Sequence, residues 1–206
     1  MKLHTMVNVL KDVPKLVRFN KATHHDHTNL GELSLPEGSF VVFDKAYTDY
    51  RQYHQLSQDN VYFITCQKDH AAWERLQEYS IDDSINAGVI KDEQIKVTKD
   101  GQDFLLSSIA YYHAEQYRIY ILLTNNHELA ADKITEIYKN RWQIESMFKR
   151  LKQNFPFKYF LGDSQYAIEI QIWVSLIAQL LMLVVQRKTQ RRGPFPIWLI
   201  RCHLNS

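Results

Sequence analysis

The stretch that decides the fold reads YKNRWQIESMFKRLK and occupies residues 138–152. On a continuous α-helix, four of its side chains fall within an arc of roughly 60° at 100° per residue. They are Tyr138, Arg141, Glu145 and Lys152. Apolar residues occupy the neighbouring face, where they would pack against a sheet. The pattern predicts an amphipathic helix that places one carboxylate in a row with two cations and a phenol.

A row of this kind has two interpretations. Charge patterning on a helix usually marks a solvated face with ion pairs four residues apart, such as Arg141 with Glu145. The spacing favours the other interpretation. Tyr, two residues, Arg, three residues, Glu, six residues and Lys resembles the motif of the IS-four family of insertion-sequence transposases at all four positions. The neighbours Trp142, Gln143 and Phe148 also resemble that family's usual context.

The resemblance extends along the whole chain. Residues 2–4 resemble the strand that follows the first catalytic acid in these transposases, and residues 23–26 resemble the segment before the first helix. Residues 43–47, Phe-Asp-Lys-Ala-Tyr, resemble the strand end that bears the second catalytic Asp, here Asp44. The chain thus resembles the C-terminal part of the catalytic domain. The implied α/β fold is a ribonuclease-H-like core that lacks its first strand, with a β-rich insertion between the second Asp and the Glu.

The family resemblance implies metal-dependent DNA cleavage and strand transfer at transposon ends. Asp44 and Glu145 would be catalytic acids and metal ligands of a two-metal site, and hard carboxylate oxygens suit Mg²⁺ or Mn²⁺. Arg141 and Lys152 would bind DNA phosphates, and Tyr138 would hydrogen-bond one.

Some members of the family stack an aromatic residue of the insertion on a flipped base. Trp73 is the only Trp in that region, and it has a DNA-stacking and a packing interpretation.

The first acid of the catalytic triad has no match. Only two Asp residues precede Asp44, and neither is in the right place: Asp12 lies in a predicted hairpin turn and Asp26 lies beyond the second strand. We therefore expect a transposase fragment that is inactive alone, whose partners are transposon-end and target DNA and, in the full-length synaptic complex, a second copy. A non-catalytic DNA-binding or regulatory protein derived from a transposase is the alternative. An unrelated α/β domain with a chance motif is a third interpretation.

Periodicity predicts the order of the elements. A hairpin of strands at 3–10 and 15–20 precedes a short helix at 28–33, a buried strand at 39–44, a helix at 49–58 and a strand at 61–66. Three further strands cover 94–98, 104–112 and 117–124, followed by one long helix at 130–153 and an apolar helix at 166–187. We divide the chain into core residues 1–69, an insertion at 70–129, C-terminal core helices at 130–190 and a basic tail at 191–206.

Composition is that of an ordinary globular protein, with 45% hydrophobic residues and a net charge of +2. The apolar run at 170–185 is shorter than the ~20 residues of a membrane span and is interrupted by Gln171, Ser175 and Gln179. It predicts a buried core helix rather than a membrane contact. The residues at 24–27 fit a polar loop better than a metal site. Two cysteines without metal spacing and no signal peptide pattern favour a reduced cytosolic compartment. With the family resemblance, this implies a bacterial cytoplasmic protein.

Overall fold

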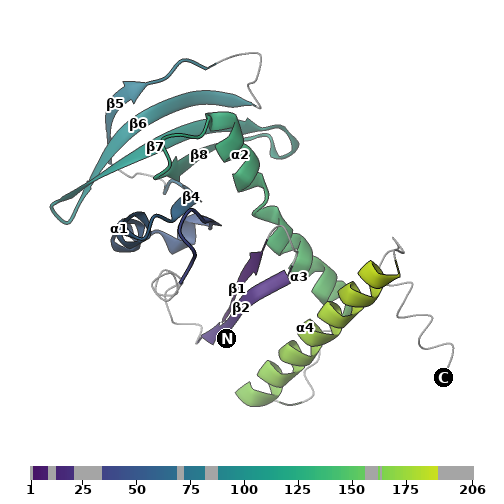
Figure 1. Cartoon of the computed structure of the whole chain (residues 1–206). Helices are drawn as coiled ribbons and strands as arrows, with labels where there is room; N and C mark the ends of the chain where they lie inside the picture. Colours follow the sequence, from purple (N-terminus) through teal and green to yellow (C-terminus); the bar gives the residue numbers. More distant parts are fainter. Residues whose placement is uncertain are drawn as a thin grey trace. The chain divides into compact units, whose positions relative to one another are not determined.

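The computed structural model describes residues 2–8, 13–20, 34–68, 72–81, 88–155, 162 and 164–189. Its elements fall into two compact units (Figure 1). One unit draws on residues 1–22 and 142–206, and the other on residues 23–141. We describe each unit by itself.

The unit of residues 23–141 is built on one mixed sheet. Its strands are β3 (Phe40–Val42), β4 (Tyr62–Cys66), β5 (Glu74–Glu78), β6 (Val89–Lys99), β7 (Gln102–His113) and β8 (Arg118–Thr124). Their order in space is β3-β4-β8-β7-β6-β5. Only β3 and β4 are parallel. The strands of the predicted β-rich insertion thus continue the same sheet as β3 and β4.

Two helices, α1 (Tyr50–Gln58) and α2 (Ala131–Lys139), cover opposite faces of this sheet. On one face Tyr53 of α1 stacks on Phe63 of β4, with ring centroids 4.3 Å apart. On the other face the next residue of β4, Ile64, packs in a cluster with Ile134 of α2. Alternate side chains of a strand point to opposite faces, so covering both faces buries the continuous apolar run of β4. The predicted buried strand at 61–66 is confirmed.

Turn and cap chemistry explain where these elements begin and end. The β6–β7 hairpin turns at Asp100 and Gly101, whose φ angles are 52° and 77°. Two left-handed residues make the tight turn that matches the twist of paired strands, and Asp-Gly is one of the pairs that favour it. Asp49 precedes α1 and its carboxylate accepts a hydrogen bond of 3.0 Å from the backbone N–H of Arg51. This cap satisfies an N–H group that the first turn leaves without a partner.

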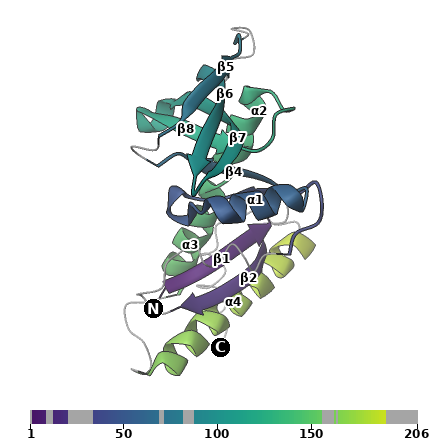
Figure 2. The same cartoon turned by 90° about the vertical axis from the view of Figure 1, so that its left-hand side faces the viewer.

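The second unit contains a hairpin and two helices (Figure 2). Strands β1 (Lys2–Asn8) and β2 (Val13–Asn20) pair antiparallel, and the helices are α3 (Trp142–Asn154) and α4 (Gln165–Lys188). Leu151, Ile172 and Leu176 form the core, against which Phe19 of β2 packs. The predicted hairpin and apolar helix are confirmed. The predicted short helix at 28–33 and the tail at 191–206 lie outside the described residues.

The single long helix predicted at 130–153 is wrong, because it breaks between Lys139 and Trp142. The backbone N–H groups of Asn140 and Arg141 donate to carbonyls three residues back, at 3.1 and 2.9 Å, instead of four residues back. The Asn140 side chain also donates to the Glu136 carbonyl at 3.3 Å. Asn disfavours helix interiors because its amide competes for such backbone groups. Residues 138–152 therefore do not present one continuous helical face.

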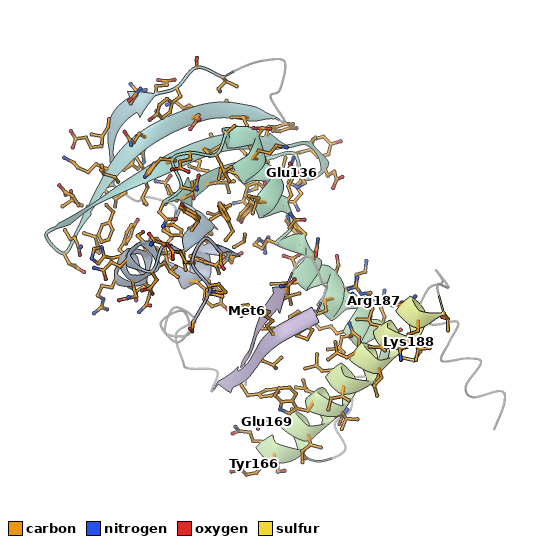
Figure 3. The ribbon with its side chains drawn as sticks, in the orientation of Figure 1. Met6, Glu136, Tyr166, Glu169, Arg187 and Lys188 are labelled. Atoms are coloured by element: carbon orange, nitrogen blue, oxygen red, sulfur yellow. The ribbon has the colours of Figure 1, made fainter. Side chains whose placement is uncertain are left out.

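One face of α4 packs inside its unit and the other is exposed. The buried positions include the polar Ser175 and Gln179, and the Ser175 hydroxyl donates to the Gln171 carbonyl at 2.8 Å. Ile170 and Leu181 are each 62% exposed, so α4 is not the wholly buried helix that the sequence predicts. Figure 3 shows Glu169 near one end of α4, with Arg187 and Lys188 near the other. By length and composition alone α4 could cross a membrane, and 22% of its apolar window is buried.

The position of β3 in its sheet bears on the predicted absence of the first strand of the core. Among the described residues, β3 is an end strand of its sheet, and the β1–β2 hairpin forms a separate sheet. In the expected core the missing first strand would lie between the hairpin and β3. The hairpin and β3 belong to different units, and the predicted central strand between them stays a prediction.

Candidate functional site

A cavity of about 370 Å³ opens in the unit of residues 23–141, beside the end of β4 and the first part of β8. Its wall contains four of the six site residues that the sequence predicts: Asp44, Trp73, Tyr138 and Arg141. They come from three separate segments of the chain, namely the end of β3, the approach to β5, and α2 with the turn after it. Folding thus brings these three segments together in one cavity, although their separation in the sequence predicts no contact between them.

Asp44 is fixed by the backbone turn that follows β3. Its carboxylate accepts a hydrogen bond of 3.2 Å from the Ala46 backbone N–H and caps the short 3₁₀ turn at Lys45–Tyr47. The Asp44 side chain is 48% exposed, and its Oδ2 lies 3.8 Å from Nη1 of Arg141. This distance is that of an ion pair without a direct hydrogen bond. Asp44 can therefore interact with a ligand while remaining in the cap.

Arg141 is more enclosed than Asp44. Its side chain is only 14% exposed, and its guanidinium Cζ lies 5.6 Å from the centroid of the Tyr138 ring. An aromatic face attracts a guanidinium and restricts its motion. The break between α2 and α3 is what brings Arg141 into this position, because it places the residue in a turn at the wall of the cavity. Arg141 is thereby a partly ordered cation next to a carboxylate.

Tyr138 has a different environment from the one that the family resemblance implies. The residue is 2% exposed, and its hydroxyl lies 3.0 Å from the Cys66 sulfur. Burial raises the pKa of the Tyr138 phenol and also that of the Cys66 thiol. Both groups are therefore neutral and paired with each other. In this conformation the phenol forms part of the hydrophobic core beneath the cavity, whereas the expected phosphate contact requires it to leave Cys66.

Trp73 lies just before β5 and is 41% exposed. It lines the cavity together with Asp44. A Trp that only packs in a core is largely buried, so Trp73 is accessible to a ligand.

Sequence reasoning missed three cations of the same wall, which are Lys45, Lys68 and Arg118. With Arg141 they make four positive side chains, against which Asp44 is the one carboxylate among the described residues that line the cavity. A surplus of cations in a concave site favours anionic ligands. Lys45 adjoins Asp44 in the sequence and could have been found there, but Lys68 and Arg118 are far from every quoted motif.

Glu145 and Lys152 belong to the other unit. Both lie on α3, and both side chains are exposed. The structure therefore places the remaining two predicted residues on one helix, seven positions apart, where their side chains share a face.

The described residues do not by themselves fit a two-metal centre. No group of three His, Cys, Asp or Glu side chains that could hold a metal ion occurs within the described ranges. Asp44 forms an ion pair with a cation, Arg141, at 3.8 Å. Asp44 could supply one oxygen ligand to a divalent cation, and further acids would have to join it. We therefore derive no reaction step through a metal ion.

Comparison with known proteins agrees with these observations. Residues 1–181 match the family model described as "Transposase DDE domain". A "Putative transposase" of Sinorhizobium fredii is 27% identical, over 98% of this chain and 59% of the relative. A "Putative transposase for insertion sequence element IS4SA" of Synechocystis sp. is 24% identical, over 88% of this chain and 52% of the relative. The chain thus spans little more than half the length of these curated relatives.

Proposed function

Since the chain belongs to the transposase DDE domain family, we propose that it is part of an insertion-sequence transposase and that its cavity binds the DNA backbone. A role in DNA transposition follows from the family, and the family implies DNA as a partner. The finer proposal is that the cavity around Asp44 and Arg141 holds a phosphodiester at the transposon end.

The observation that carries the proposal is the convergence of Asp44, Trp73 and Arg141 on one cavity wall. Each of these residues was singled out from a different part of the sequence. A phosphate needs a cation that can donate two hydrogen bonds, and a guanidinium offers such a fork. An adjacent nucleotide base needs an aromatic face, which Trp73 provides. The cavity thus offers both kinds of contact that a DNA strand requires.

In the same proposal the chain is the C-terminal part of an IS-four family catalytic domain with a ribonuclease-H-like core. Residues 1–69 and 130–190 form that core, and 70–129 form the β-rich insertion. Asp44 and Glu145 are the catalytic acids and would hold Mg²⁺ or Mn²⁺ together with an acid from outside the described residues. Such an ion would supply Lewis-acid stabilisation of charge on the phosphodiester oxygens. Tyr138 and Lys152 complete the DNA contacts.

The larger assembly also belongs to the proposal. The full-length transposase acts as a homodimer on transposon ends and target DNA, in the bacterial cytoplasm and without a membrane contact. In that assembly Lys152 of α3 would bind a phosphate as a point charge, because an ammonium lacks the planar fork of an arginine.

A direct test is DNA binding by the 206-residue chain. We expect a fluorescein-labelled oligonucleotide to bind, and we expect Arg141→Gln to weaken binding about tenfold at low salt, since a charge-assisted hydrogen bond is lost. Lys133→Gln is the matched control. Lys133 lies outside the cavity wall and is ion-paired with Glu136 at 3.0 Å. No binding by the parent chain, or an equal loss in both variants, would refute the proposal.

One observation favours a second candidate function, a non-catalytic DNA-binding or regulatory protein. Asp44 is accompanied by cations on the cavity wall, which suits phosphate binding better than metal binding. The two candidates differ in one measurable outcome. A non-catalytic protein binds transposon ends and competes with an intact transposase, whereas the catalytic candidate, in a version restored to the full length of its relatives, nicks them in Mn²⁺. Nicking that Glu145→Gln abolishes would decide for the catalytic candidate.

A further inference from the structure

Strand β8 carries an arginine to which the family motif assigns no role. The Cζ atom of Arg118 lies 5.3 Å from the centroid of the Tyr120 ring, two residues further along the strand. Tyr120 stacks in turn on Tyr111 of β7, with centroids 5.6 Å apart and planes inclined by 21°. Both Arg118 and Tyr120 line the cavity. Two strands of a rigid sheet therefore hold this guanidinium at the cavity wall.

Arg118 differs from several cations of its unit in having no carboxylate partner among the described residues. Lys91 and Lys96 lie 2.7 and 2.6 Å from glutamate oxygens. By contrast, none of the acidic side chains in the described part of the chain lies within ion-pair distance of Arg118 or Lys68. A cation that is ordered on an aromatic ring yet not neutralised is ready to bind an anion.

The two arginines of the wall repeat the same arrangement. Arg141 lies over the ring of Tyr138, as Arg118 lies over the ring of Tyr120. The two tyrosine rings adjoin each other, with centroids 6.3 Å apart. Each guanidinium thus lies over one ring of an adjoining pair. Two cations supported by separate rings suit successive phosphates of one strand better than a single phosphate.

We propose that Arg118 binds a backbone phosphate of an unpaired DNA strand that also contacts Arg141, with Lys68 as a neighbouring point charge. This inference rests on the proposed function and extends it to β8, a strand outside the family motif. The DNA strand in this proposal is unpaired because of the size of the cavity. Its volume of about 370 Å³ lies near the lower end of the range of small-ligand sites. A duplex could only lie across the mouth of a cavity of this size.

The test is the salt dependence of binding by the 206-residue chain to a labelled single strand and to its blunt duplex. Each phosphate contact contributes about 0.7 to the slope of log Kd against log salt for single strands. We expect Arg118→Gln to lower this slope by about 0.7 and to weaken single-strand binding about tenfold at low salt. Arg118→Lys keeps the charge and should restore the slope. Lys133→Gln, with the same loss of charge outside the cavity, should change neither quantity.

The outcomes separate this inference from the proposed function. Loss of binding in Arg141→Gln with full binding and an unchanged slope in Arg118→Gln would overturn the role of Arg118 and leave the proposed function intact. An equal loss on the duplex would overturn the assignment to an unpaired strand. An effect of Lys133→Gln as large as that of Arg118→Gln would reduce the result to net charge and overturn the inference. Thermal unfolding of each variant at the parent temperature excludes misfolding as the cause of a loss.

Discussion

Replacing Asp44 with Asn should tighten DNA binding, although Asp44 is a proposed catalytic acid. The carboxylate stands beside Arg141 at 3.8 Å, so it holds a cation that the phosphate needs and repels the phosphate itself. Asn removes the charge but keeps an oxygen for the cap on the Ala46 N–H. Asn and Asp are equally good caps. The substitution therefore tests electrostatics with little disturbance of the local backbone.

The magnitude follows from the distance and the exposure of the pair. Two unit charges 3.8 Å apart interact by about 1 kcal/mol in water and about 4 kcal/mol at an effective dielectric constant of about 20. Asp44 is 48% exposed, so solvent screening places the value at or below the lower limit, about 0.5–1 kcal/mol. That range corresponds to a Kd about two- to fivefold lower in Asp44→Asn.

The assay is fluorescence anisotropy of a labelled DNA strand in EDTA, so that no divalent cation contributes. The difference between Asp44→Asn and the parent should shrink as salt rises, because the Debye length falls from about 10 Å at 0.1 M to about 3 Å at 1 M. Glu136→Gln is the matched control, since Glu136 is exposed and lies outside the cavity wall. If Asp44→Asn bound DNA no better than the parent, or if Glu136→Gln gained as much affinity, the reasoning would be refuted.

Four further outcomes are expected. Tyr138→Phe should lower the free energy of unfolding in urea by about 1 kcal/mol, because it removes the hydrogen bond to Cys66; unchanged stability with lost DNA binding would mean that the phenol contacts DNA. Trp73→Ala should weaken single-strand binding by about 1–3 kcal/mol and Trp73→Phe by less, because stacking needs an aromatic face; equal affinities for the two variants would exclude stacking. Burial raises the pKa of Cys66 above its ordinary value of about 8.5. The folded chain then binds more protons than the unfolded chain, so stability should fall as pH rises above about 8.5. Urea titrations of Cys66→Ala at pH 8 and 10 should show a smaller fall, and an identical fall would contradict this cause. Finally, the 206-residue chain should not nick transposon ends in Mn²⁺, because neither Asp that precedes Asp44 matches the first acid of the catalytic triad; nicking that is lost in Glu145→Gln would contradict this expectation.

Local sequence patterns were sufficient for most of the secondary structure. The run at 61–66 is continuously apolar, and a strand covered on both faces requires that pattern. The helix at 50–58 follows a capping Asp, which marks its start. These elements were predictable because their causes lie within a few residues of each other. The pairing of β4 with β8 joins residues about 60 positions apart, and no local pattern specifies such a partner.

The break between α2 and α3 shows a limit of periodicity. Ile137 and Ile144 keep the apolar spacing of one helix on both sides of Asn140, so the pattern predicts continuity. The interruption depends on backbone hydrogen bonds three residues back at Asn140 and Arg141, and a hydrophobic period does not record them. Motif spacing survives such a break because it counts residues and assumes no helical geometry. Motif spacing therefore identified Tyr138 and Arg141, which line the cavity, although the single helical face predicted for residues 138–152 was wrong.

The same distinction explains which part of the cavity the sequence could reveal. Asp44 and Arg141 belong to motifs whose spacing fits a known family, so they can be found without a structure. Arg118 has no motif, and its importance rests on two facts of packing: a tyrosine ring supports it, and no described carboxylate neutralises it. The chain has 25 Lys and Arg against 23 Asp and Glu, so a lysine or arginine count cannot identify an anion site. The cations that folding leaves without an acid are the informative ones, and they become visible only when the strands that carry them are paired.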